Sequence, residues 1–150
     1  MFDKTEIVRD YPLEQYNVTA SDALADGEIV AILASAGTAQ RASDATGTYV
    51  RGVAKCVRDG KVEITNGIFL FKNDTTNAVV RKTHVGGACY VKDYQTVDSD
   101  GGTYKVVAGL VVDVTSDGVY VDMRLPALAA ANALVNAAKA ATDLATHIAG

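Results

Sequence analysis

Pairs of Asp or Asn with Gly recur through the first 125 residues, and this feature most limits what the chain can fold into. They stand at Asp26-Gly27, Asp59-Gly60, Asn66-Gly67, Asp100-Gly101-Gly102 and Asp117-Gly118. Such pairs are typical of tight turns between strands because they adopt positive φ at little cost. Short β-branched or aromatic runs separate them: Glu28–Leu33, Tyr49–Val57, Lys61–Thr65, Ile68–Lys72, Ala88–Lys92, Tyr104–Thr115 and Val119–Arg124. The pattern predicts a mainly β fold, a small barrel or sandwich of short antiparallel strands.

The clearest hairpin spans Val112 to Met123, with a two-residue loop at Asp117-Gly118. In this register Ser116 pairs with Val119, Val114 with Val121, and Val112 with Met123. Those side chains then share one face, because residues two apart in a strand point the same way. The other face carries Asp113, Thr115, Tyr120 and Asp122.

The segment Ile64–Phe69 allows two interpretations. A tight hairpin at Asn66-Gly67 would place Lys61 opposite Lys72, an unfavourable like-charge pair. One long strand with a glycine bulge at Gly67 avoids that pair, and we favour it. Two further segments are predicted to be loops: Ser35–Thr48 and Asn73–Ala78.

The composition divides the chain into three parts. Residues 1–21 have no sustained periodicity and predict an extended arm, with Tyr11, Leu13 and Tyr16 as its anchoring side chains. Residues 22–125 form the β domain. Residues 126–150 are nearly half alanine and predict a helix, with Pro126 in its first turn.

Polar residues in this helix recur at steps of three and four and form one narrow stripe: Asn132, Asn136, Lys139, Asp143 and His147. The rest of its surface is apolar and needs a partner surface. The helix either folds back on its own β domain or packs between copies in an oligomer. For the second alternative, the predicted interface residues are Leu128, Ala131, Leu134, Val135, Ala138, Ala141 and Ile148.

Charge and composition argue against several classes of protein. The formal charge is −4, the pI is about 5.0, and Lys and Arg are scattered, so we expect no nucleic-acid binding. The charged opening residues disfavour a signal peptide, and the Ala-rich segment is too polar for a membrane span. Cys56 and Cys89 lie in apolar strand-like runs, where a cysteine acts as a small hydrophobe in a reducing compartment.

No catalytic, metal or cofactor motif emerges from the sequence. His84 and Cys89 lack the additional ligands that a structural metal site needs. The glycines lack the context of a phosphate-binding loop. Asp113 and Asp122 would face each other on the polar side of the hairpin, yet such a pair more often binds solvent or a lysine. We therefore expect a protein that is not an enzyme; a hydrolase using His84 and aspartates is the weakest alternative.

Several glycine-containing strand blocks, in their order, resemble the small capsid decoration, or cement, proteins of tailed bacteriophages. The resemblance covers about Gly27 to Asp122. Its blocks are Gly27-Glu28-Ile29-Val30, Arg51-Gly52-Val53-Ala54, Asn66–Phe71, Val85–Val97, Val107–Val114 and Ser116–Asp122. The Ala-rich helix after Pro126 departs from the family pattern.

The resemblance implies a β-rich virion protein on the capsid exterior, made in the host cytoplasm, that clamps neighbouring major capsid subunits. Its partners would be the major capsid protein, contacted through the arm residues Tyr11, Leu13 and Tyr16, and other copies of itself, as a homotrimer or else a dimer. Such a role requires no cofactor. The alternative is another phage structural component, such as a head-fibre base or a tail-associated protein.

Overall fold

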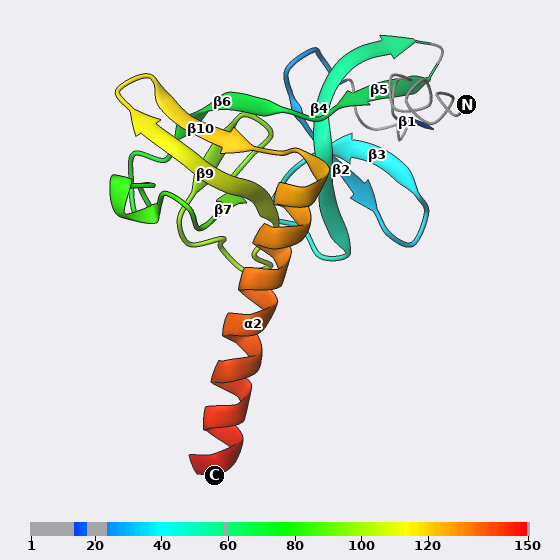
Figure 1. Ribbon diagram of the computed structural model, residues 1–150. Coiled ribbons are helices and arrows are strands. Elements are labelled where there is room, and N and C mark those ends of the chain that lie inside the picture. The colour runs from blue at the N-terminus through cyan, green and yellow to red at the C-terminus, as the bar shows by residue number, and fades with distance from the viewer. Residues whose placement is uncertain (1–13, 18–23, 59, 150) are drawn as a thin grey trace, which may run out of the picture.

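The computed structural model describes residues 14–17, 24–58 and 60–149, and it describes side chains for 24–55 and 60–141. These described residues form two β-sheets and one long helix (Figure 1). The first sheet has the order β1-β5-β4-β2-β3, with β1 Glu14–Asn17, β2 Ile29–Leu33, β3 Thr38–Arg41, β4 Thr48–Arg58 and β5 Lys61–Thr65. The second is a closed barrel, β10-β6-β8-β7-β9, with β6 Ile68–Asn73, β7 Ala88–Val91, β8 Thr96–Asp98, β9 Val107–Thr115 and β10 Gly118–Asp122. The predicted mainly β fold is confirmed.

The two sheets pack together because side chains cover both faces of β2. Ile29 and Ala31 belong to a large core that includes the barrel interior, Val50, Val53 and Leu128. Val30 and Ile32 point the opposite way, into a smaller core within the first sheet. Alternate residues of a strand point to opposite faces, so an unbroken apolar run is what a strand between two cores requires.

The chain passes from the first sheet to the barrel at Asn66-Gly67. β5 pairs with β1 and β4, whereas β6 pairs with β8 and β10, so the tight hairpin between them is wrong. The single long strand that we favoured is wrong as well, because β5 ends at Thr65 and β6 begins at Ile68 in the other sheet. The side-chain amide of Asn66 donates to the carbonyl oxygens of Arg51 (2.7 Å) and Met123 (3.0 Å). The Met123 N–H donates to the Gly67 carbonyl at 2.7 Å. These bonds tie the crossing point to both sheets.

The hairpin of β9 and β10 exists, but its predicted register is wrong by two residues. Val119 pairs with Val114 and Gly118 with Thr115, so the loop is Ser116-Asp117. A bulge then brings Val121 opposite Val111. Consequently Val111 is buried, whereas Val112, predicted to share a face with Val121 and Met123, is 42% exposed. A bulge inserts one extra residue and reverses the facing of everything beyond it.

Two short strands were not predicted. β3 falls within Ser35–Thr48, which the sequence predicted as a loop, and β8 follows the Asp93-Tyr94-Gln95 turn. Both strands are short, and their sequences carry little β signal. β3 forms because β2 beside it offers hydrogen bonds, and β8 forms because β7 does so. β8 also runs parallel to β6, an exception to the antiparallel expectation. Residues 74–78 form a loop as predicted.

Helix α2, Leu125–Ala149, begins with Pro126 in its first turn as predicted. Its early turns pack on the barrel, mainly against β9, where Ala127, Leu128 and Ala131 are buried. The later turns extend away from the β domain as a stalk (Figure 1). None of the described helices is long and apolar enough to span a membrane.

Within the predicted arm, the structure describes only residues 14–17, which form β1 at the edge of the first sheet. Tyr16 of β1 lies opposite Val62 of β5. Tyr11, Leu13 and the side chain of Tyr16 lie outside the described part of the chain.

Candidate functional site

The predicted interface residues of α2 fall into two groups. Leu128 (6% exposed) and Ala131 (0%) pack in the core of their own domain. Beyond them Leu134 is 50% exposed, Val135 is half-buried, and Ala138 and Ala141 are exposed. The side chain of Ile148 is outside the described residues. The folded-back alternative therefore describes the first turns, while the contact of the later turns with another copy stays a prediction.

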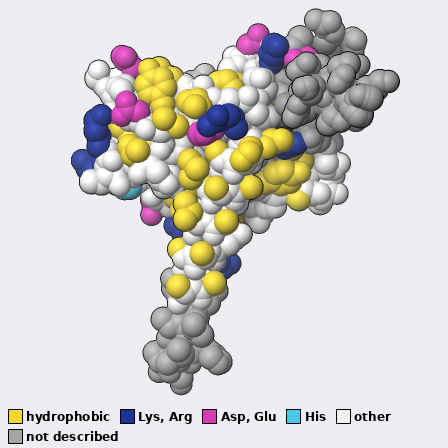
Figure 2. Space-filling model, viewed as in Figure 1, with side chains coloured by type: hydrophobic (Ala, Val, Ile, Leu, Met, Phe, Trp, Pro, Cys, Tyr) yellow, Lys and Arg dark blue, Asp and Glu magenta, His cyan; other side chains and the backbone are white. Residues whose placement is uncertain are grey.

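The outward side of the stalk is an apolar stripe that the sequence analysis only partly identified. Its members follow one another at steps of four, three and four: Ala130, Leu134, Ala137 and Ala141. We call this set the outer seam. All four residues are exposed, and the space-filling view shows apolar side chains along the helix (Figure 2). Alternation of three and four is the spacing of coiled-coil contacts, and this signal could have identified Ala130 and Ala137.

At its base the outer seam meets a hollow between the barrel and the start of α2. Leu110, Pro126, Ala127 and Ala130 provide its apolar walls. Arg124 and Asp122 also line it, and three hydrogen bonds join them, of which the shortest is 2.7 Å. The pair holds the pKa of Asp122 below its usual value, mainly through the hydrogen bond to Arg124. Apolar surface thus continues from the seam onto the barrel.

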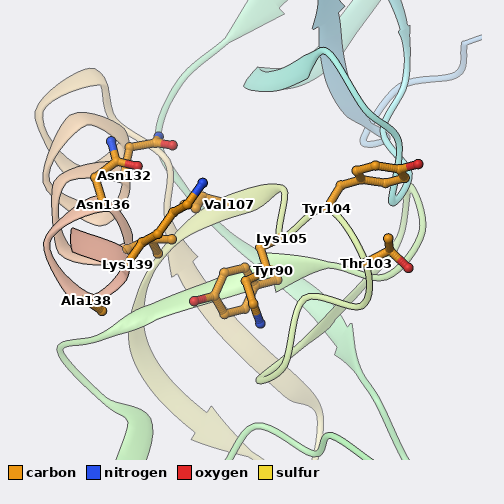
Figure 3. A pocket seen from close by; sticks show the side chains of 10 residues that line it. Tyr90, Thr103, Tyr104, Lys105, Val107, Asn132, Asn136, Ala138 and Lys139 are labelled. Atoms are coloured by element: carbon orange, nitrogen blue, oxygen red, sulfur yellow. The ribbon is translucent and has the colours of Figure 1, made fainter. Parts of the chain in front are cut away.

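The polar stripe of α2 faces the other way, toward its own domain. Asn132, Asn136 and Lys139 form one wall of a groove of about 650 Å³, which we call the stalk groove (Figure 3). Val135 and Ala138 complete the helix side. The opposite wall and floor come from β7, β9 and the loop between β8 and β9: Tyr90, Thr103, Tyr104, Lys105 and Val107.

The loop wall of the stalk groove is fixed from behind by Asp44. Its carboxylate accepts hydrogen bonds from the N–H groups of Thr103 (2.8 Å) and Tyr104 (2.7 Å). Gly102 comes so close to Asp44 that a Cβ at this position would lie 2.3 Å from the carboxylate. No sequence motif indicated this contact, since Asp44 and the loop are about 60 residues apart.

Lys105 adopts a left-handed backbone conformation (φ 51°), which is unusual for a residue other than glycine. Its ammonium group donates to the Asp100 carbonyl at 2.7 Å and lies 5.6 Å from the centre of the Tyr90 ring. The pKa of Tyr90 is raised, chiefly because the phenol is partly desolvated and also because Cys89 and acidic groups are near. The groove therefore has a structured aromatic and cationic floor.

The residues considered for catalysis have structural surroundings. Cys89 is fully buried, and burial raises the pKa of its thiol to about 12, so it is not a nucleophile at neutral pH. His84 accepts a hydrogen bond from the Arg81 N–H at 2.8 Å in the short 3₁₀ helix η1, Lys82–His84.

The predicted pairing of Asp113 with Asp122 is wrong, because the shifted register separates them. Asp113 lies opposite Tyr120, whereas Asp122 lies opposite Leu110. The Asp113 carboxylate instead accepts a hydrogen bond from Lys82 at 3.1 Å, which lowers its pKa.

Among the described residues, no three His, Cys, Asp or Glu side chains cluster closely enough to hold a metal ion. No protein-family model, curated protein or solved structure matches the chain. The site is therefore assigned from its own geometry, and it consists of the outer seam and the stalk groove on two sides of α2.

Proposed function

We propose that this protein is a structural virion component that binds the outer surface of a tailed-phage capsid and clamps neighbouring major capsid subunits. Support comes from the order of glycine-containing strand blocks, most of which fall on β2, β4, β6, β7, β9 and β10. A rigid β domain with a stalk provides contact surfaces and requires no ionisable centre. The contacting partners are the major capsid protein and other copies of the chain.

The observation that carries the proposal is the orientation of α2. An amphipathic helix on a lone domain turns its apolar side inward, whereas the stalk leaves Leu134 and its alanine neighbours facing solvent. A surface of this kind is normally covered. The three-four spacing of the outer seam suits a second helix with the same seam.

A homotrimer uses this seam better than a dimer. Residues 132–149 extend for about 27 Å at 1.5 Å per residue, and alanine contributes little area per contact. In a three-helix arrangement each helix has two neighbours, so each buries about twice the area that a pair would bury, closer to the size of a stable interface.

Capsid binding would act through mass action. A protein that binds the assembled lattice but not the free subunit stabilises the lattice by an amount that grows with its concentration. Purified protein should be a trimer by light scattering and should bind expanded capsids in a sedimentation assay. Protein that stays monomeric and fails to bind would refute the proposal.

The alternative is another phage structural component, such as a head-fibre base or a tail-associated protein. The stalk is the observation that favours it, since a projecting helical bundle would also suit the base of a fibre. Separating heads from tails in disrupted particles and blotting for the protein distinguishes the two. Recovery with tails, or only with fibres, would support the alternative.

A further inference from the structure

The stalk groove is a second surface, distinct from the outer seam, and the proposed function does not use it. We propose that it binds an extended peptide segment that carries acidic side chains. The inference concerns the chemistry of the groove and does not depend on a capsid partner. Three features lead to it: the charge of the lining, its mixture of rings and amides, and the fixed position of the loop wall.

The charge of the lining is one-sided although the chain as a whole is acidic. The ten lining residues include Lys105 and Lys139 and no carboxylate. Lys139 has no carboxylate partner among the residues that the structure describes. Asp44 lies behind the loop wall, and both of its carboxylate oxygens accept hydrogen bonds from backbone N–H groups. The carboxylates of Asp98 and Asp100 also lie near Tyr90, but none of these acids is part of the lining. The charges that a ligand meets in the groove itself are those of the two lysines, which favour an acidic ligand.

The two lysines come from opposite walls: Lys139 from α2, and Lys105 from the loop beside the Tyr90 ring (Figure 3). A single small anion is best held by converging donors, such as the N–H groups of a helix N-terminus or a nest. The stalk groove instead offers two separate lysine charges, one on each wall. An extended chain matches this layout because its alternate side chains are spread over several ångströms.

The remaining lining residues are suited to binding a peptide rather than a small inorganic anion. Tyr90 and Tyr104 present ring surface, and Tyr104 is 52% exposed. Val107, Val135 and Ala138 offer apolar contacts, and Asn136 offers an amide that can pair with a peptide backbone. A groove of about 650 Å³ has the size of a typical ligand site.

The loop wall is already held in position before any ligand binds. Asp44 fixes the Thr103 and Tyr104 backbone, and Lys105 is held in its left-handed conformation by contacts to Asp100 and Tyr90. Backbone conformations of this kind are unfavourable for a residue other than glycine and persist where the surroundings enforce them. A fixed wall spares the ordering cost that binding would otherwise carry.

The test is an NMR titration of nitrogen-15-labelled full-length protein with a synthetic peptide of alternating Glu and Val. Matched probes are the same peptide with Gln in place of Glu, and inorganic phosphate. We expect the acidic peptide to shift the amide signals of Tyr104, Lys105 and Asn136, and added salt to weaken the binding. Lys139→Glu should weaken it about tenfold or more, since a favourable charge becomes repulsive.

Lys72→Glu is the matched control, because Lys72 is an exposed lysine that lies outside the stalk groove and bonds to Gln95. It should change the affinity less than about twofold. Equal losses for the two variants, or absence of shifts in the groove, would overturn the inference. So would equal binding of the Gln peptide, and phosphate acting at the same or lower concentration would replace the peptide with a simple anion.

Discussion

At the scale of single residues, Asp74 shows how one buried carboxylate organises a loop. It is 4% exposed and accepts hydrogen bonds from Lys92 (2.6 Å), from the Thr76 hydroxyl (2.8 Å) and N–H, and from the Ala78 N–H. The Lys92 contact is the main reason why the pKa of Asp74 lies well below its usual range. One side chain therefore closes the 74–78 loop.

The first prediction concerns the pH dependence of this carboxylate. A pKa that folding depresses gives stability that is complete above the unfolded value, about 3.9, and is lost as pH falls toward the folded value. Asp74→Asn should lower the free energy of unfolding by about 1–3 kcal/mol at pH 7. Urea unfolding from pH 7 to 2 measures both effects, and the difference between the proteins should shrink below about pH 4. A difference that stays constant would contradict this role.

The second prediction concerns Cys89. Its thiol is fully buried, with Sγ 3.8 Å from the Gly109 carbonyl oxygen and a pKa raised to about 12. In a Cys56→Ser background, a thiol reagent at pH 8 should modify the native protein only at the rate of unfolding, because the thiolate is both scarce and inaccessible. Urea should release one reactive thiol. Rapid modification without urea would contradict the prediction.

At the scale of elements, sequence patterns predicted the strands whose residues alternate between apolar and polar or form a continuous apolar run. They missed the strands that form only because a neighbouring strand offers hydrogen bonds. Lys61–Thr65 matches β5 at both ends, and β2, β4, β6, β7 and β10 differ from their predicted bounds by a few residues at most. β3 and β8 carry no apolar signal of their own. Their pairing partners are set by tertiary contacts that a single sequence does not display.

Register was the other limit at this scale. The Asp117-Gly118 pair is a strong turn signal, yet Gly118 belongs to β10. It is required there because its backbone passes the barrel strand β6 at close range: a Cβ on Gly118 would lie 2.2 Å from the Phe71 carbonyl oxygen. In the sequence, a glycine that is needed because two backbones lie close together looks the same as a glycine that is needed for a turn.

The third prediction follows from that contact. Gly118→Ala should cost about 3 kcal/mol or more, because the added methyl group meets backbone that cannot move without opening the barrel. Gly37→Ala is the control: its φ is 68° but nothing lies within 4 Å of the added carbon. It should cost only about 1–2 kcal/mol for the left-handed conformation. If urea unfolding showed an equal loss of unfolding free energy in both variants, the backbone conformation at Gly118, and not the lack of space, would explain the cost.

At the scale of the whole molecule, the candidate site was only partly predictable. Periodicity predicted a helix with a polar stripe, and both are confirmed for the described residues. It could not predict which side of the helix meets the domain, because Leu128 and Leu134 are equally apolar in sequence. The barrel surface at β9 covers Leu128 and Ala131, and the outer seam stays exposed.

The last prediction uses this division. Leu134→Asp places a charge on a side chain that is 50% exposed, so the domain should keep its unfolding free energy within about 0.5 kcal/mol per isolated subunit. If copies pack along the outer seam, the same change buries an unpaired carboxylate between helices and should dissociate the oligomer into folded subunits. Light scattering and circular dichroism together measure this.

Leu128→Asp is the matched substitution on the opposite side of α2. Leu128 is 6% exposed and belongs to the main core, so a carboxylate there should cost about 3 kcal/mol or more and unfold the domain or detach the stalk. Loss of folding in Leu134→Asp would instead mean that the seam serves the core of its own chain. An oligomer that survives Leu134→Asp would mean that copies associate through another surface, and the stalk would then be free for a different partner.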